Sequence, residues 1–494
     1  MANQEKKAKT LFNSTENSNF ILNMTEKQYA KLASIGLIGS CVIVSLFTLI
    51  PEIFTTSTYT FSAAGLAVCG VYCMIMTIIA LIKKYIKGST LLPVCAFSFT
   101  LLWGAVSVFR SADMYVGLYG FPERCEGLLA IIFYWCIFVA AASIKKKKAA
   151  EALFNGLILA GMVNSTVALI QIFTGKLSHY KMVSLHIETN SASGLAQSPL
   201  FLAMLLTLSL TAALICAVTT KVGRFRNISL IASAIFGFVM MMTYSFIGIC
   251  GIVFSVIAAA LSVFITKQPK KKILSIIPTA VGAAAAVIIV SAGLIGNISS
   301  YRLYDGRELW WADSYMRITA SGDFNYDVND IDDTLDLYLN MNSKTMDIIS
   351  DNKLTGTGPD QLAFPQVYTA GPSEELEDPA VVDIIKYNKG VFDRVYNEYL
   401  YTAATRGIPS LIALLLVIVP MLFVSFGAMK KRRGAVGTTL FFLALGGSLL
   451  FLIGCGNITY SPVFWAVAGI ACALPHIDEN EVTRIEKEPK AAKK

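Results

Sequence analysis

The sequence predicts an all-α, polytopic membrane protein with about twelve transmembrane helices and a large extracytoplasmic helical loop domain. Of the 494 residues, 55% are hydrophobic and only 15% are charged, whereas soluble domains carry roughly 25% charged residues. Apolar stretches recur at the length of about 20 residues that a helix needs to cross a membrane. One long acidic segment interrupts their series and predicts a folded loop outside the bilayer.

The apolar stretches define the predicted spans. They occupy residues 32–50, 61–82, 90–109, 127–144, 150–174, 194–219, 228–244, 249–266, 273–295, 408–426, 436–454 and 463–474. The last stretch is short, so we expect its helix to begin earlier, near Asn457. No signal peptide is expected, because the first stretch follows about thirty polar residues and is long enough to span.

Lysine and arginine residues gather in the short loops that follow even-numbered spans. These loops hold 18 basic residues, at positions 83, 84, 87, 145–148, 221, 224, 226, 267, 270–272 and 430–433. The short loops on the other side hold only Arg110, Arg124, Lys176 and Lys181. Since basic residues mark cytoplasmic loops, we expect a multi-pass protein of the cell (plasma) membrane with both termini in the cytoplasm. The clusters adjoin spans, which indicates contact with membrane lipids and argues against nucleic-acid binding.

The segment between the ninth and tenth spans differs from the rest of the chain. It holds 19 acidic and 9 basic residues. A connection of this length is either functional or disordered, and its many aromatic residues favour an ordered domain. The sequence therefore predicts an N-terminal cytoplasmic tail (1–31), nine spans (32–295), an extracytoplasmic loop domain (296–407), three spans (408–474) and a C-terminal cytoplasmic tail (475–494).

Two patterns in the loop domain are weak candidates for ligand sites. The acidic run 323–333 is similar to a calcium loop, but Val328 and Thr334 stand where glycine and a bidentate glutamate are needed. A solvated acidic loop is the alternative. Gly356 and Gly358 form a Gly-x-Gly turn, whose backbone amides can approach an anionic ligand.

The ten cysteines show no spacing typical of a metal site, so neither a metal nor a cofactor is expected. Cys125 and Cys455 both fall near the outer face. A disulfide between them and ordinary packing of free thiols are the two alternatives, and packing is favoured because free cysteines are usually buried.

Four motifs follow one another beside the loop domain. They are Gly306-Arg307 with Trp310, Asn352-Lys353-Leu354-Thr355-Gly356-Thr357-Gly358, Asn397-Glu398-Tyr399-Leu400 and Thr405-Arg406-Gly407-Ile408-Pro409. Two more precede spans, Arg124-Cys125-Glu126-Gly127-Leu128 and Ser193-Gly194-Leu195-Ala196-Gln197-Ser198-Pro199. On these residues, the chain resembles the O-antigen ligase and O-antigen polymerase superfamily over residues 110–426.

The resemblance implies a membrane glycosyltransferase of cell-surface polysaccharide assembly. Such an enzyme takes a glycan from a polyprenyl pyrophosphate carrier and joins it to a hydroxyl of an acceptor glycan or lipid at the outer face. The departing pyrophosphate gains negative charge, which arginine offsets by bidentate binding. The acceptor hydroxyl must also lose its proton to a base. Arg307 matches a catalytic position of the superfamily.

Two positions depart from the superfamily pattern. Tyr396 stands where relatives carry a histidine, the proposed base, and Phe246 stands where they carry an arginine. Tyrosine has a pKa near ~10 and is a poor base at neutral pH unless a neighbour such as Arg394 lowers that pKa. Two interpretations follow: an enzyme that uses Glu398 or Asp393 as its base, or a non-catalytic relative that binds glycan lipid.

Arg307, Tyr396 and Glu398 are therefore the candidate catalytic residues. The candidates for substrate binding are Arg110, Arg124, Trp310, Arg394 and Asn397. The arginines at span ends either hold phosphates or extend to the lipid interface. Trp310 either stacks on a sugar or anchors at the interface.

A twelve-span transporter or flippase is the rival class. Transporters of that kind have two related halves, and no repeat links the first six spans with the last six. Whether the chain polymerises a glycan or transfers it to a final acceptor is left open, as are the sugar and the acceptor.

Overall fold

The computed structural model describes residues 23–50, 58–121, 124–174, 192–196, 198–220, 223–243, 245–292, 342–362, 394–432, 434–478, 481 and 483. Helices account for the regular structure of these residues, and no strand occurs among them. The prediction of an all-α, polytopic membrane protein is confirmed.

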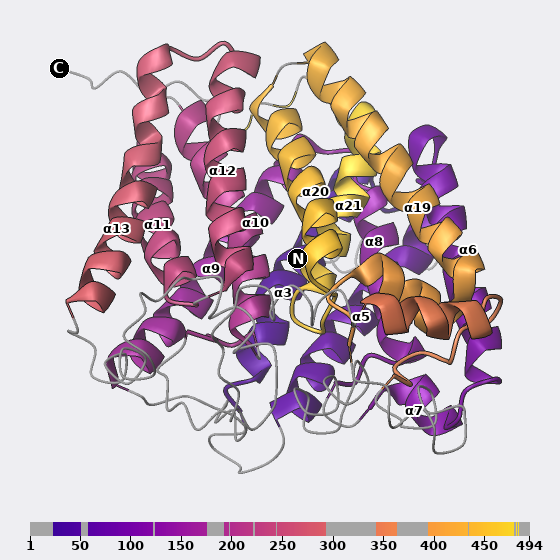
Figure 1. Cartoon of the computed structure of the whole chain (residues 1–494). Helices are drawn as coiled ribbons and strands as arrows, with labels where there is room; N and C mark the ends of the chain where they lie inside the picture. The colour runs from indigo at the N-terminus through magenta and orange to yellow at the C-terminus, as the bar shows by residue number, and fades with distance from the viewer. Residues whose placement is uncertain are drawn as a thin grey trace, which may run out of the picture.

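The helices follow one another as a bundle of long rods (Figure 1). They are α3 (Glu26–Phe47), α5 (Thr58–Ile82), η1 (Gly88–Thr90), α6 (Leu91–Val108), α7 (Met114–Tyr119), α8 (Leu128–Ala142), α9 (Lys147–Thr174), α10 (Pro199–Thr219), α11 (Arg224–Met241), α12 (Phe246–Ile265), η2 (Lys270–Ile276), α13 (Ile277–Ser291), α19 (Glu398–Arg432), α20 (Ala435–Ile453), α21 (Ser461–Ala473) and η4 (Leu474–His476).

Ten of the described helical segments are long and apolar enough to cross a membrane. Two shorter apolar segments, Leu128–Ala142 and Ser461–His476, stand where the fourth and twelfth spans are predicted. Helix α21 begins at Ser461 rather than near Asn457. The reason is local, because Asn457 Oδ1 accepts the N–H groups of Thr459 (3.2 Å) and Tyr460 (2.7 Å) and so holds a turn ahead of the helix.

Helix α10 forms the centre of the bundle. Every residue from Pro199 to Thr219 is buried, and the helix packs against α9, α11, α12 and α20. Its start is fixed by sequence, because Ser198 accepts the N–H of Phe201 at 3.2 Å and Pro199 occupies the first helical turn. Helix α13 is the opposite case, with exposed Ile277, Val281 and Ile288 on an outer face, as a lipid-facing helix requires.

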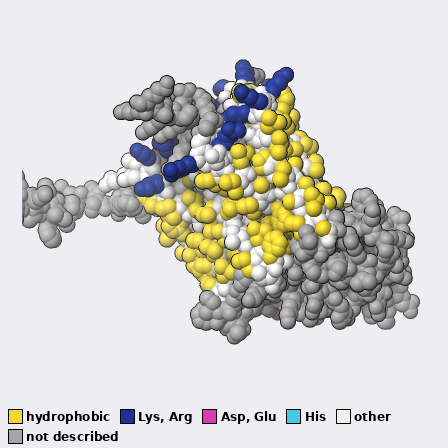
Figure 2. Space-filling model, turned by 90° about the vertical axis from the view of Figure 1, so that its left-hand side faces the viewer, with side chains coloured by type: hydrophobic (Ala, Val, Ile, Leu, Met, Phe, Trp, Pro, Cys, Tyr) yellow, Lys and Arg dark blue, Asp and Glu magenta, His cyan; other side chains and the backbone are white. Residues whose placement is uncertain are grey.

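Basic side chains gather at one end of the molecule. Figure 2 shows Lys and Arg side chains at the upper end, above a belt of hydrophobic side chains. Helix α19 ends there with Lys430, Lys431 and Arg432, and it begins with Glu398 at the opposite end of the bundle. The residues around Glu398 therefore lie at the membrane face opposite the basic clusters.

Candidate functional site

The site is built around the first turns of α19. Asn397 caps this helix, because its Oδ1 accepts the N–H groups of Tyr399 (3.0 Å) and Leu400 (3.1 Å). The N–H of Glu398 donates to the carbonyl of Gly454 at 3.1 Å, which ties the start of α19 to the end of α20. The helix therefore begins with a polar stretch ahead of the apolar stretch that predicts the tenth span.

Gly407 interrupts α19 with a positive φ of 79°. Pro409 has no N–H, so the carbonyl of Thr405 lacks its helical donor. The N–H of Gly358 donates to that carbonyl instead (2.9 Å), and the N–H of Thr357 donates to the carbonyl of Ala404 (2.9 Å). The turn at 353–358 thus completes the hydrogen bonds that the break in α19 leaves open.

This arrangement corrects the interpretation of the Gly-x-Gly turn as an anion site. The amides of Thr357 and Gly358 are already used by the carbonyls of α19. Gly356 has a φ of 64°, and a Cβ there would collide with the backbone of Thr405 and Arg406. These glycines are required for close contact with the broken helix.

Helix α6 holds the same turn from its other side. Ser107 Oγ donates to the carbonyl of Thr405 at 3.0 Å and also contacts the carbonyl of Thr355. Trp103 Nε1 donates to the carbonyl of Leu354 at 2.7 Å. In Figure 1 the short helix of residues 342–351 lies across the lower ends of α6 and α19. The described part of the predicted loop domain is therefore fixed on the bundle.

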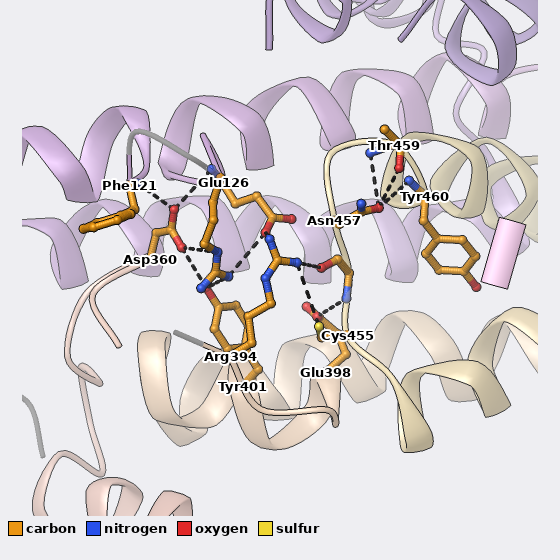
Figure 3. Close-up of polar contacts among 12 residues, drawn as sticks. Phe121, Glu126, Asp360, Arg394, Glu398, Tyr401, Cys455, Asn457, Thr459 and Tyr460 are labelled. Atoms are coloured by element: carbon orange, nitrogen blue, oxygen red, sulfur yellow. Dashed lines mark hydrogen bonds and ion pairs between the residues drawn. The ribbon is translucent and has the colours of Figure 1, made fainter. Parts of the chain in front are cut away.

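Buried ion pairs join four segments at this end of the bundle (Figure 3). Arg124 Nε lies 3.0 Å from Asp360 Oδ1, and Arg124 Nη2 lies 3.3 Å from Glu126 Oε2. Arg394 Nη2 lies 3.1 Å from the same Glu126 oxygen. The guanidinium of Arg394 also stacks over Phe201, 4.8 Å from the ring centroid, so α10 takes part in the cluster.

Tyr401 and two backbone amides complete the contacts of Asp360. Oδ1 accepts the hydroxyl of Tyr401 at 3.3 Å, and Oδ2 accepts the N–H groups of Phe121 (2.7 Å) and Glu126 (3.3 Å). Tyr401 also accepts a hydrogen bond from Arg124 Nη2 at 2.9 Å. Asp360 therefore fixes the backbone of Glu126 as well as the side chain of Arg124.

Glu398 forms the other half of the cluster. Its Oε2 accepts the N–H of Gly456 at 2.8 Å, and its Oε1 lies 3.7 Å from Arg406 Nη2. Arg406 donates to Thr402 Oγ1 at 2.8 Å, one helical turn earlier. Arg394 Nη1 donates to the carbonyl of Gly456 at 3.1 Å, so Gly456 links the two halves.

A cavity of about 50 Å³ lies between α6, α8, α19, α20 and α21, and this is room for a few water molecules. Its polar lining consists of Thr100, Glu126, Tyr134, Asp360, Glu398, Tyr401, Thr405, Arg406 and Ser461, and its apolar lining includes Phe97, Ile131, Leu414, Val417, Phe451 and Trp465. Charged side chains therefore share the lining of the cavity with aromatic and aliphatic side chains.

The cluster balances three arginines, Arg124, Arg394 and Arg406, against three carboxylates. Buried charges are tolerated only when they are paired and hydrogen-bonded. Burial raises the pKa of Glu126 to about 7, although Arg394 and Arg124 act to lower it. A carboxyl group with this pKa exchanges its proton near neutral pH.

The structure brings together three of the candidate residues. Arg124, Arg394 and Glu398 belong to the cluster, whereas Asn397 acts as a helix cap. Tyr396 is partly buried in the segment that precedes α19, and Arg110 is exposed beyond the end of α6. Arg307, Trp310 and Asp393 lie outside the described residues.

Four cluster residues are absent from the candidates that the sequence predicts: Glu126, Asp360, Tyr401 and Arg406. Glu126 and Arg406 stand within the motifs that carry the resemblance, and a charged residue beside a predicted span is the available signal. Asp360 gives no such signal, because its partner Arg124 is remote in sequence.

Two further expectations concern the same face. Cys125 and Cys455 are both free thiols, so the packing alternative holds. Among the described residues, no three His, Cys, Asp or Glu side chains are grouped as metal ligands would be.

Phe246 is 43% exposed at the start of α12, and it makes this position apolar where the superfamily pattern has arginine.

A comparison with protein families identifies one match. The model described as O-antigen ligase matches residues 231–415. The matched region includes α12, α13, the turn at 353–358 and the start of α19, and it therefore covers Arg394, Glu398 and Arg406. No curated protein matches the chain. The resemblance that the motifs predict is confirmed by this match.

Proposed function

Since the chain carries the O-antigen ligase domain of the O-antigen ligase and polymerase superfamily, we propose that it is a membrane glycosyltransferase of polysaccharide assembly. Its donor is a glycan on a polyprenyl pyrophosphate carrier, and its acceptor is a hydroxyl of another glycan or of a lipid. The reaction takes place at the membrane face where α19 begins, outside the cell, with both termini in the cytoplasm.

The buried charged cluster beside the cavity is the observation that supports this proposal. It places Arg394 within 3.1 Å of Glu126 at one end of a membrane bundle, and Glu126 and Glu398 line the same cavity. Burial of six charged groups is costly, and ionisable residues buried within a membrane bundle are candidates for function. The cluster combines groups that accept a proton with cations that hold them in position, as acid-base chemistry requires.

The cation that offsets the charge of the departing pyrophosphate is a separate requirement. Each cluster arginine already faces a carboxylate in the described residues. Arg110 is exposed just beyond the end of α6, and we propose that Arg110 and Arg307 contact the pyrophosphate. A guanidinium suits this task because it binds two phosphate oxygens at once.

We also propose that residues 296–407 form an extracytoplasmic domain. Helix α19 runs through the second boundary, with the break at Gly407 marking it. The turn at 353–358 attaches the described part of that domain to α19.

The test is transfer from a polyprenyl pyrophosphate glycan in vesicles that contain the purified protein and an acceptor glycan. Wild type is compared with Arg307→Ala and with Arg317→Ala as the matched control from the same segment. We expect product from wild type and from Arg317→Ala, and a loss of about 10²-fold or more in Arg307→Ala, as for other groups that stabilise developing charge. Binding of the donor by wild type without formation of product would instead support a relative that binds glycan lipid but does not catalyse transfer. In that case Tyr396 and Phe246 would mark the loss of the histidine and the arginine of the superfamily pattern.

A further inference from the structure

We propose that Glu126 is the base that removes the proton from the acceptor hydroxyl, in place of the histidine that Tyr396 replaces. This inference rests on the proposed glycosyl transfer. Glu126 comes two residues before the start of α8, with Gly127 between them, and its side chain lines the cavity. Its position is held by Asp360, which accepts its backbone N–H at 3.3 Å.

The contacts of the three cavity carboxylates distinguish Glu126 from the others. Glu398 uses both oxygens, Oε2 for the N–H of Gly456 and Oε1 for Arg406 and Thr402. Asp360 also uses both, for Arg124 and Tyr401 on Oδ1 and for two backbone N–H groups on Oδ2.

Glu126 is different, because both of its arginine contacts fall on Oε2. Within the described residues, Oε1 takes part in neither contact, and Figure 3 shows no bond drawn to it. A base needs a lone pair that is free to receive the proton while the rest of the group is held still. Among the three cavity carboxylates in the described part of the chain, Glu126 meets that condition.

The groups around Glu126 come from each element packed against it. Arg124 lies in the same loop, Arg394 precedes α19, Asp360 follows the helix of residues 342–351, Glu398 begins α19, and Tyr134 faces the cavity from α8. Burial raises the pKa of Glu126 to about 7, the two arginines lower it, and the two carboxylates raise it. The group is thus ionised in a large fraction of molecules at neutral pH and still basic enough to take a proton.

Transfer to the acceptor forms one bond at the anomeric carbon and breaks another. The acceptor hydroxyl oxygen forms a bond to the anomeric carbon of the donor glycan, and the bond from that carbon to the carrier phosphate oxygen breaks. The hydroxyl proton passes to Oε1 of Glu126, and the electron pair of the broken bond leaves with the polyprenyl pyrophosphate. Release of the proton through the waters of the cavity returns Glu126 to its ionised form.

The experiment compares an acceptor that needs a base with one that does not. Vesicles carrying wild type or Glu126→Gln receive the polyprenyl pyrophosphate glycan with either the acceptor glycan or sodium azide. Azide is already an anion, so its attack forms a glycosyl azide without proton removal. The rate of glycosyl azide formation by wild type gives the reference for azide.

We expect Glu126→Gln to lose about 10²- to 10⁴-fold of hydroxyl transfer and to keep azide transfer within a few fold. Retained hydroxyl transfer, or an equal loss with both acceptors, would overturn the role of base. If wild type transfers to neither acceptor, the proposed function itself fails, and this outcome is distinct from the others.

The dependence of kcat/KM on pH tests the same role of Glu126 in the wild-type protein, without a substitution that can prevent folding. For wild type, log(kcat/KM) is expected to rise by one for each pH unit below about pH 7 and to level off above it. Glu398→Gln serves as the comparison carboxylate from the same cavity and should keep this rising limb, whatever its rate. A wild-type profile that is flat between pH 5 and pH 7 would contradict the assignment.

Discussion

Arg124 and Asp360 form a buried ion pair, with 3.0 Å between Nε and Oδ1, that joins the loop before α8 to the turn after residues 342–351. This ion pair connects the outer segment of residues 342–362 to the helical bundle. Asp360 in turn holds the backbone of Glu126, so the geometry of the cavity depends on a contact between two distant parts of the chain.

Asp360→Asn should destabilise the protein by about 3–5 kcal/mol, because the buried Nε of Arg124 would lose the carboxylate that it faces at 3.0 Å. The measurement is thermal unfolding in detergent. Asp347→Asn is the control, since Asp347 is exposed on the helix of residues 342–351, and its effect should stay within about 0.5 kcal/mol. Equal midpoints for Asp360→Asn and wild type would contradict the structural importance of this pair.

Gly407→Ala should also lower stability, by at least about 1–2 kcal/mol, since the residue has a φ of 79°. A Cβ at this position would collide with the carbonyl of Leu354. Gly427→Ala is the control in the same helix, because a Cβ there would enter open space and alanine favours helix. The two variants are expected to shift the unfolding midpoint in opposite directions, and a Gly407→Ala variant as stable as wild type would refute the proposed contact.

A third prediction concerns pH and stability. The folded pKa of Glu126 is raised to about 7, whereas glutamate in an unfolded chain titrates near ~4.3. The folded state therefore holds this proton more tightly, and its stabilising effect is fully present below about pH 4.3 and lost as pH rises through about 7. The unfolding midpoint of wild type, relative to that of Glu126→Gln, should fall between pH 5 and pH 7.5. A difference that stays constant over this range would contradict the raised pKa.

The fourth prediction concerns the opposite face. Arg432 donates to the carbonyls of Leu474 (2.7 Å), Pro475 (2.6 Å) and Ile477 (3.0 Å), which fastens the chain after α21 to the end of α19. Arg432→Ala should cost about 1.5–3 kcal/mol, the usual range for hydrogen bonds that involve a charged group. Lys431→Ala, which changes an exposed neighbour, should have little effect. Faster proteolysis after residue 474 in Arg432→Ala alone would confirm this role, and equal rates in both variants would exclude it.

The spans can be predicted from sequence because hydropathy and length are local properties. Helix α19 begins at Glu398, ahead of the predicted tenth span at residue 408. The helix of residues 398–407 is not predicted by hydropathy, since it depends on the cap at Asn397 and on contacts with α6 and α20. The break at Gly407 is visible as Gly407-Ile408-Pro409, but the turn that completes it comes from residues 353–358. Hydrogen bonds between segments so far apart in the sequence depend on the tertiary structure and cannot be predicted from local composition.

The candidate site can be predicted only in part for the same reason. The sequence indicates Arg124, Arg394 and Glu398 as candidates, and the structure brings them together. Their partners Asp360 and Tyr401 can be assigned only from the fold, whereas Arg406 stands in a motif beside the predicted tenth span. Glu126 stands in the motif Arg124-Cys125-Glu126-Gly127-Leu128. Its proposed role as base, however, follows only from the structure, in which both arginines contact its Oε2.

The rate of transfer by Glu398→Gln in vesicles tests whether the cavity at the start of α19 is the site of glycan transfer. Asp351→Asn is the matched control, because Asp351 is an exposed carboxylate of the same outer segment. We expect Glu398→Gln to lose about 10²-fold of the wild-type rate, since misplacement of groups at a reacting centre costs about that much, and Asp351→Asn to keep it. Equal transfer by wild type and both variants, with all three inserted and folded, would contradict the placement of the reaction at this cavity.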